Sequence, residues 1–191
     1  MDYTEIKEWL KKNLNEERYL HTLGTADCAK ELAKKYNLNE EKAYLAGLLH
    51  DCAKCFSKEK LLNIIKENLE VDESEMLNYK TLHAPVSAYV AAKEFGVDDE
   101  EILSAIRWHT LGKLEMSDFE KIIFIADKIE PNTRDAEYSA KIKELMDEDN
   151  GLNKALLKLY KETIKSLCKR DLKICLLTIE IYNKLQDLVQ N

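Results

Sequence analysis

The chain has 191 residues, of which 45% are hydrophobic and 34% are charged, and its formal net charge is −7. This composition is typical of a folded globular protein with a sizeable core, and it excludes a disordered chain. The acidic balance argues against general binding to nucleic acid or to an anionic membrane, because both need a basic surface.

The N-terminal part of the chain predicts two amphipathic helices. Asp2 and Glu5 have the spacing of a capping box, and an apolar stripe follows them. A second helix is expected over about 16–36. Its predicted inward-facing residues are Leu20, Leu23, Ala26 and Leu32.

The next two helices are marked by residues that favour N-cap positions. Asn39 is expected to cap a third helix, whose apolar residues lead directly to His50 and Asp51. Ser57 is expected to cap a fourth helix over 58–69.

Proline, glycine and capping patterns delimit the helices that follow. Pro85 suits a first helical turn, and Gly96 lies where that helix should end. Pro131 should end a later helix. Two helices in this region should begin at capping boxes, formed by Asp98 with Glu101 and by Ser117 with Glu120.

Two long helices are expected at the C-terminal end, over about 152–169 and 172–189. The alternation typical of strands is missing throughout, which predicts an all-α fold. We expect a single domain, in which a catalytic bundle of about 1–146 carries a helical extension of about 150–191. The expected core aromatic residues are Tyr36, Phe95, Phe119 and Phe124.

The cysteines and the N-terminal segment bear on the compartment. The chain has five cysteines, an odd number that is typical of reduced thiols. The first ten residues lack the apolar stretch of a signal peptide, and no segment approaches the ~20 apolar residues of a membrane span. We therefore expect a cytoplasmic protein. Cys52 and Cys55 form a CxxC pair without the context of a redox or zinc site, so we interpret them as packing residues.

Histidines and aspartates form an ordered pattern along the chain. A lone histidine on a helix is usually packed or solvated, but here all four histidines fall into one series with two aspartates. Imidazoles and carboxylates together are the ligand set of a divalent transition metal. Asp127 ends an apolar run, where a carboxylate is costly to bury without a cation or strong donors. The series is His21, His50, Asp51, His83, His109 and Asp127.

The series places its ligands on separate helices, which is how helical bundles build metal sites. His50 and Asp51 are consecutive and lie ~100° apart around a helix axis. Both still reach one ion near the C-terminal end of that helix, where the backbone carbonyls favour a cation.

The local motifs resemble those of the YqeK family of bacterial HD-domain hydrolases, which are similar to symmetrical bis(5′-nucleosyl)-tetraphosphatases. The resemblance covers nearly the whole chain. One departure is an extra residue between Asn132 and Arg134, which bears on the aim of that arginine. The matching stretches are Arg18–Thr22, Gly47–Lys54, Leu82–Pro85, Arg107–Thr110 and Ile125–Pro131.

The resemblance implies an all-α HD fold and a metal held by a quartet of residues. The implied metal is iron, for which manganese or cobalt substitutes. His83 and His109 line the same cleft, where they either contact phosphate or hold a second metal bridged by Asp51. The quartet consists of His21, His50, Asp51 and Asp127.

Helical spacing adds roles for cationic residues around the metal, for each of which a solvated surface position is the alternative: Lys54 lies one turn after His50, and Arg18 lies three residues before His21. The catalytic group comprises Asp51, His83, His109 and Lys54. Lys54 and Arg18 are expected to clamp a pyrophosphate, Arg134 the distal nucleotide, and Arg170 a base or ribose. The full substrate-binding set is Arg18, His21, Lys54, His83, His109, Thr110, Asp127, Arg134 and Arg170.

The implied reaction is the hydrolysis of diadenosine tetraphosphate into two molecules of ADP. Three alternatives stay open: an HD hydrolase acting on a nucleoside monophosphate or a cyclic dinucleotide, a di-iron HD oxygenase, and a nucleotide sensor without activity. The expected partner is a small nucleotide, with ADP or GDP as product and neither nucleic acid nor membrane involved. A homodimer is left open.

Overall fold

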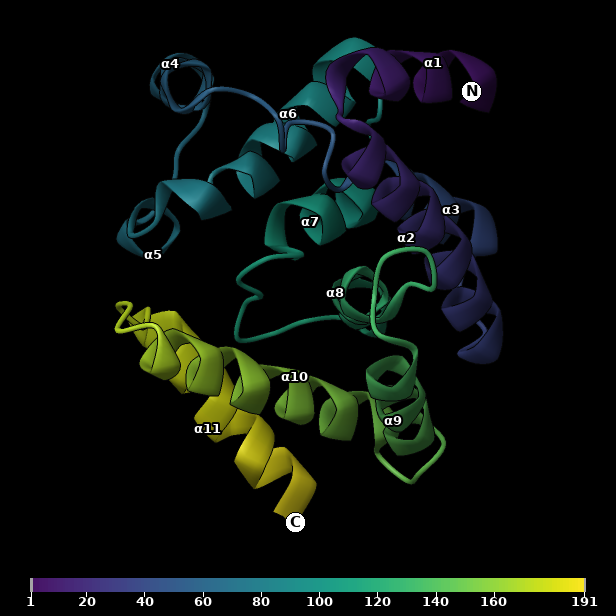
Figure 1. The fold of residues 1–191 in the computed structure, drawn as a ribbon, viewed down its shortest axis with the longest axis vertical. Coiled ribbons are helices and arrows are strands. Elements are labelled where there is room, and N and C mark those ends of the chain that lie inside the picture. Colours follow the sequence, from purple (N-terminus) through teal and green to yellow (C-terminus); the bar gives the residue numbers. More distant parts are fainter. Residues whose placement is uncertain (1, 191) are drawn as a thin grey trace.

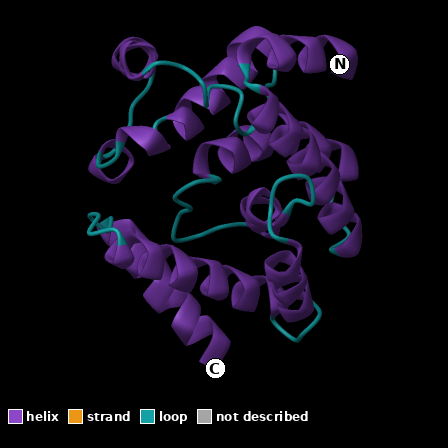
Figure 2. Ribbon diagram, viewed as in Figure 1, coloured by secondary structure: helices purple, strands orange, loops and turns teal. Residues whose placement is uncertain are grey.

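The computed structural model describes residues 2–190, and within them every regular element is helical (Figures 1 and 2). The predicted all-α fold is confirmed. The α-helices are α1 Tyr3–Asn13, α2 Glu16–Lys35, α3 Glu40–Leu49, α4 Lys58–Asn68, α5 Glu73–Met76, α6 His83–Phe95, α7 Glu100–Trp108, α8 Asp118–Ile129, α9 Ala136–Met146, α10 Gly151–Lys169 and α11 Leu176–Gln190, with a 3₁₀ turn, η1, at Tyr79–Thr81.

Most predicted helix ends are confirmed by their capping contacts. Asn39 accepts a hydrogen bond from the Lys42 amide at 3.0 Å and starts α3. Ser117 and its partner complete the predicted capping box of α8. Gly96 ends α6 with φ at +65°, a left-handed conformation that glycine adopts without steric cost.

Two predicted helix starts are wrong. The side chain of Asp99, rather than that of Asp98, accepts the first amides of α7. Helix α11 begins at 176 instead of 172. The reason is that Leu172 takes part in the C-terminal cap of α10, which itself ends at Lys169. The Leu172 amide donates to the Leu167 carbonyl at 3.0 Å across Asp171, whose φ is +51°, and this closes a Schellman motif.

Helix α9 and the short elements α5 and η1 were not predicted. Helix α9 begins five residues after Pro131, and Asp135 caps it by accepting from the Tyr138 amide. Leu20 was predicted to face inward but is 44% exposed. The inward face of α2 is instead partly polar, since His21 and Thr22 are buried there.

Helix α8 lies at the centre of the molecule (Figure 1). It packs against α2, α3, α7, α9 and α10. An apolar segment that is buried on all sides is typical of a core helix, and 122–126 is such a run. Asp127 follows this run directly and is itself buried. The core helix therefore carries a carboxylate into the interior of the protein.

The two C-terminal helices pack on the bundle as predicted. The rings of Phe124 and Tyr160 stack with centroids 5.4 Å apart. The Tyr160 hydroxyl donates to the Leu111 carbonyl at 2.6 Å, which ties α10 to the loop after α7. Ile181 and Leu185 of α11 belong to the same buried cluster as the bundle. The exact division at about 146–150 stays a prediction.

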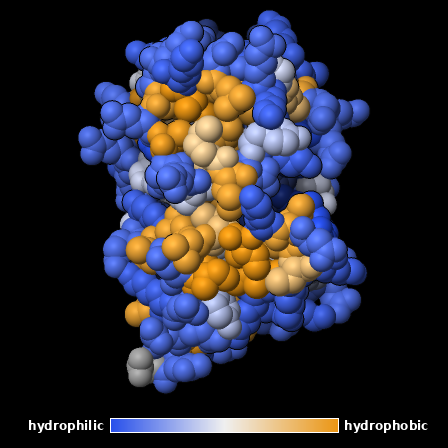
Figure 3. Space-filling model, turned by 90° about the vertical axis from the view of Figure 1, so that its left-hand side faces the viewer, coloured by the Kyte–Doolittle hydropathy of each residue, from blue (hydrophilic) through white to orange (hydrophobic). Residues whose placement is uncertain are grey.

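The described surface is mixed in polarity. Figure 3 shows apolar side chains gathered on the side of the molecule that carries α4, α5 and the turn before α11. Exposed apolar residues in these segments include Met76, Leu77 and Leu176. None of the described helices has the length and apolar character needed to cross a membrane.

Candidate functional site

All four histidines of the chain converge in the interior, and each is at most 2% exposed. They come from four segments: α2 carries His21, α3 ends at His50, α6 starts at His83 and α7 ends at His109. The Nε2 atoms of His21 and His50 lie 3.3 Å apart, and those of His83 and His109 lie 3.2 Å apart. The predicted grouping of the histidines is therefore present.

Backbone carbonyls fix the protonation of three of these rings. The Nδ1 atoms of His50, His83 and His109 each lie 2.7 Å from the carbonyl oxygen three residues earlier. A carbonyl oxygen only accepts hydrogen bonds, so each Nδ1 carries the proton. In the neutral ring, each Nε2 then presents a lone pair to the common centre, as a metal ligand must.

His21 is oriented by Glu130, which the sequence reasoning missed. Glu130 Oε1 lies 3.0 Å from His21 Nδ1, and the carboxylate is fully buried. It also accepts hydrogen bonds from the amides of Asn132 and Thr133. Burial raises the pKa of Glu130, but the hydrogen bonds from Thr133 and His21 outweigh it and hold the pKa below its usual value. A carboxylate behind a metal-binding imidazole is a common supporting contact.

The four predicted metal ligands lie together. His21 Nε2 is 2.9 Å from Asp127 Oδ1 and 3.8 Å from Asp51 Oδ2. His50 Nε2 is 3.6 Å from Asp51 Oδ2 and 3.7 Å from Asp127 Oδ1. Adjacent ligands about 2.1 Å from one ion stand roughly 3 Å apart. The ligand atoms of His21, His50 and Asp51 all lie within 4.8 Å of one another and could hold a divalent ion, with Asp127 beside the two histidines.

Asp51 also faces a second group of ligand atoms. Its Oδ1 lies 2.9 Å from His83 Nε2 and 3.4 Å from His109 Nε2. This oxygen is buried and has no hydrogen-bond partner within the described residues. The facing imidazole nitrogens carry lone pairs instead of protons, so acceptors meet acceptors. Such an arrangement calls for a cation, and the donor chemistry of both groups fits a metal ion.

The pKa values of the aspartates and histidines are shifted by burial and by one another. Burial raises the pKa of Asp51 and of Asp127, but neighbouring histidines and, for Asp127, Lys128 hold both well below the usual range. Burial lowers the pKa of His109 to about 3 and also lowers the pKa of His83. For His50, burial lowers the pKa, but Asp51 and Asp127 outweigh burial and raise it. The two carboxylates are therefore ionised, and His83 and His109 are neutral, near pH 7, which are forms that bind metals.

Four cationic side chains surround the two aspartates. Arg18 Nη1 lies 3.1 Å from Asp51 Oδ2, and Lys54 Nζ lies 3.7 Å from Asp51 Oδ1. Lys54 Nζ is also 3.0 Å from His83 Nε2. On the other side, Arg134 Nη2 lies 3.2 Å from Asp127 Oδ1, and Lys128 pairs with Asp127 Oδ2.

Three of these four cations are residues that the sequence analysis selected. Arg18, Lys54 and Arg134 all reach the site, and the extra residue before Arg134 does not turn it away. Lys128 was missed, although its place directly after Asp127 in a matched motif was a usable signal.

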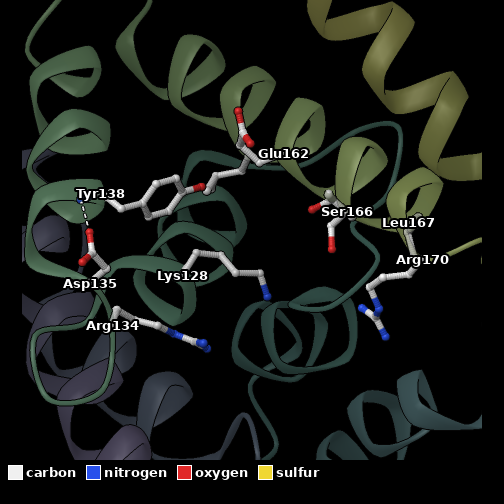
Figure 4. Close-up of a pocket in the computed structure, with 10 residues that line it drawn as sticks. Lys128, Arg134, Asp135, Tyr138, Glu162, Ser166, Leu167 and Arg170 are labelled. Atoms are coloured by element: carbon white, nitrogen blue, oxygen red, sulfur yellow. Dashed lines mark hydrogen bonds between the residues drawn. The ribbon is translucent and has the colours of Figure 1, made fainter.

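Arg170 lies farther out, in a cavity of about 400 Å³ that Lys128 and Arg134 also line. Figure 4 shows these three side chains extending from three different segments along the cavity. Thr110 lies beside the histidines, with its Oγ1 3.1 Å from His109 Nε2. It lines a neighbouring cavity of about 230 Å³ that also includes Lys128. The 400 Å³ cavity, which Asp135 and Glu162 also line, borders the aspartate–histidine centre through Lys128 and Arg134, the two cations that pair with Asp127.

The CxxC pair takes no part in this centre. Cys52 is buried, and its thiol donates to the Ser87 carbonyl at 3.5 Å. Burial raises the pKa of Cys52 to about 12, so the group remains a thiol. The packing interpretation therefore holds for Cys52 and is wrong for Cys55, which is exposed.

Comparisons with known proteins agree with this geometry. The HD domain family model matches residues 18–132. The chain is 40% identical to "Bis(5′-nucleosyl)-tetraphosphatase, symmetrical" of Halalkalibacterium halodurans, over 97% of each protein. It is 38% identical to the protein of the same name from Bacillus subtilis, over 96% of this chain and 97% of the relative.

A solved structure is similar over the same length. It is the crystal structure of a predicted HD superfamily hydrolase involved in NAD metabolism from Clostridium acetobutylicum. The TM-score is 0.90 with 41% sequence identity, and 98% of each chain is covered. With its four histidines and two aspartates gathered as the motifs predicted, the chain belongs to the HD-domain family, in the YqeK-type group of symmetrical bis(5′-nucleosyl)-tetraphosphatases.

Proposed function

We propose that this protein is a metal-dependent hydrolase that splits diadenosine tetraphosphate in the middle and releases two molecules of ADP. The observation that carries the proposal is the position of Asp51, whose two carboxylate oxygens face two pairs of imidazoles and lie beside cationic side chains. Similarity over nearly the whole chain to proteins named for this reaction supports it over the monophosphate, cyclic-dinucleotide and oxygenase alternatives.

The proposed metal ligands are His21, His50, Asp51 and Asp127, and the proposed metal is iron, with manganese or cobalt as substitutes. Such an ion supplies Lewis acidity toward a phosphoryl oxygen and lowers the pKa of water from 15.7 toward ~7. A second ion held by Asp51 and the other two histidines is the alternative to direct phosphate contact by those histidines.

The protein's own residues supply binding and charge. Lys54 and Arg18 lie on the Asp51 side and donate to phosphate oxygens, while Arg134 and Lys128 do so on the Asp127 side. Fixed cations of this kind stabilise charge that develops as the phosphoryl group moves. His83 Nε2 carries a lone pair beside Asp51 and is placed to accept the proton of the attacking water.

Arg170 and Thr110 complete the proposed substrate contacts. Arg170 lines the cavity together with Arg134, where it meets the base or ribose of one ADP half. Thr110 Oγ1 contacts His109 and donates to a phosphate oxygen. The cytoplasmic location, the absence of nucleic-acid and membrane partners, and a homodimer stay predictions.

The position of the broken bond tests the function directly. Attack of water on a phosphorus adjacent to the central bridging oxygen, with breakage of its bond to that oxygen, yields two ADP. Turnover in oxygen-18 water should therefore place one heavy oxygen on the terminal phosphate of one ADP of each pair, as measured by mass spectrometry. Formation of AMP and ATP would contradict symmetrical cleavage and leave a metal hydrolase of another specificity.

Replacing Lys54 should weaken catalysis without removing the metal. Lys54→Ala removes a charge-assisted contact to phosphate, so we expect kcat/KM to fall roughly 10- to 100-fold with normal metal content. Rates and elemental analysis at low and high salt measure this. Lys66→Ala, an exposed lysine on α4, is the matched control. If Lys54→Ala showed wild-type kinetics at low ionic strength, Lys54 would have no role in binding phosphate.

His109→Ala separates the two roles left open for the outer histidines. If His109 contacts phosphate, the variant should keep its metal content and lose turnover by about 100-fold or more. If it holds a second ion, the metal content of the fully loaded protein should fall toward half. Unchanged metal content together with unchanged rates would contradict both roles.

A further inference from the structure

A second cavity, lined by lysines, adjoins the centre through Lys54 and His83. Its volume is about 320 Å³, and it shares none of its lining residues with the cavity of Lys128, Arg134 and Arg170. Three lysines and two aromatic rings line it together with His83, and no carboxylate is among its lining residues. The lysines are Lys54, Lys58 and Lys80, and the rings belong to Phe56 and Tyr79.

The two cavities reach the centre through different aspartates. Lys54 lines the second cavity and lies 3.7 Å from Asp51 Oδ1. Arg134 lines the first cavity and lies 3.2 Å from Asp127 Oδ1. Both aspartates belong to one ligand quartet, so a molecule that spans both cavities would pass the centre at its middle.

The lining of the second cavity suits a nucleotide. Tyr79 is 46% exposed, and the Lys58 Nζ lies 5.4 Å from its ring centroid. Lys60, which does not line the cavity, covers one face of Phe56 with its Nζ 3.3 Å from the ring centroid, so Tyr79 is the ring available to a base. Proteins that bind unpaired nucleotides use this combination, in which aromatic rings stack on bases and nearby cations hold phosphates. In a chain with a net charge of −7, a lining of lysines without an acid favours an anionic ligand.

We propose that this cavity binds the second nucleoside diphosphate half of the substrate, with its base against Tyr79 and its phosphates on Lys58, Lys80 and Lys54. The assignment rests on the proposed function, because a symmetrical substrate has two equivalent halves and needs a place for each. The first half then occupies the cavity of Arg134 and Arg170, and the central phosphates lie at the aspartates between them.

Binding of ADP to the metal-loaded protein tests the assignment. Calorimetry should find two ADP molecules per chain for the wild type. Tyr79→Ala should weaken one of the two sites roughly ten-fold, the loss expected for one stacked base. Tyr79→Phe keeps the ring and should retain both sites. Lys66→Ala, outside the cavity, controls for general loss of charge, and Arg170→Ala should weaken the other site only.

Kinetics distinguish a nucleoside contact from a structural effect of the substitution. Tyr79→Ala should raise KM for diadenosine tetraphosphate about ten-fold and leave kcat unchanged, and Tyr79→Phe, which keeps the ring, should retain the wild-type KM. A fall in kcat without a rise in KM would overturn the assignment, since the ring would then act on the shared centre or fold.

The outcomes separate this assignment from the proposed function. The assignment of the second cavity is supported if the wild type binds two ADP molecules and Tyr79→Ala weakens one of the two sites. This holds whichever products the enzyme forms. One ADP in the wild type, or two unaltered sites in Tyr79→Ala, overturns the cavity assignment even if the wild type produces two ADP. AMP and ATP as products would instead overturn the symmetrical cleavage alone.

Discussion

Asp51→Ala should purify with little bound metal and lose turnover by on the order of a thousand-fold or more. The reason is that Asp51 is shared by both ligand groups: Oδ2 faces His21 and His50, and Oδ1 faces His83 and His109. Its removal leaves the four imidazoles with a single aspartate, and it also leaves Arg18 without its ion-pair partner. Elemental analysis and product chromatography measure the two losses together.

Two further variants make this result specific. His50→Ala removes a ligand of the quartet alone, so it should abolish tight metal binding and activity in the same way. Cys55→Ala changes an exposed residue four positions after Asp51 and should keep both metal and rate. Normal metal content in Asp51→Ala would remove the aspartate from the metal site.

The parts of the fold that were predictable are those encoded by local chemistry. Asn39, Ser57 and Ser117 cap helices because their side chains satisfy amides two or three residues away, and this needs no knowledge of the rest of the chain. The histidine and aspartate series was predictable for a different reason. All four histidines of the chain fall into one ordered series with two aspartates, and this combination of residue types is a ligand set for divalent metals.

The missed features depend on contacts between distant segments. Glu130 supports His21 across 109 positions of sequence. Its backing role is visible only once α2 lies against the end of α8. Leu20 was placed in the core by helical periodicity. In the folded protein, α2 instead turns the neighbouring His21 toward the interior, so the buried face of this helix does not follow its apolar residues.

The residues that line the two cavities were predicted only in part, again because distant segments form each cavity. Arg134 and Arg170 were selected from the sequence, but their shared cavity also requires Lys128 and the packing of α10 against α9 and α8. Tyr79 and Lys80 lie in η1, a 3₁₀ turn that carries no periodic signal. Only the fold brings them beside Lys54 and His83.

The second large effect is expected from Gly47, which lets α3 approach α2 closely. A Cβ atom at this position would lie 2.7 Å from the Ala26 Cα and 3.0 Å from the Thr25 carbonyl oxygen. Both contacts are with backbone atoms, so they are relieved only if the helices move apart. Such overpacking typically costs about 1–3 kcal/mol. In a chain of this size that lowers Tm by roughly 2–4 °C for each kcal/mol.

Gly47→Ala should also damage the metal site, because the two helices carry its ligands. His21 lies one turn before Thr25 on α2, and the Gly47 carbonyl is the oxygen that accepts from His50 Nδ1. Separating the helices therefore pulls His21 and His50 apart, and we expect weaker metal binding as well as a lower Tm. Gly96→Ala is the matched control: it strains a left-handed residue, with no atom within 4 Å of the new Cβ, far from both ligands in the chain. It should lower Tm without changing metal affinity. Equal metal affinity in Gly47→Ala and the wild type, measured by competition with a chelator, would show that the α2–α3 spacing does not set the site.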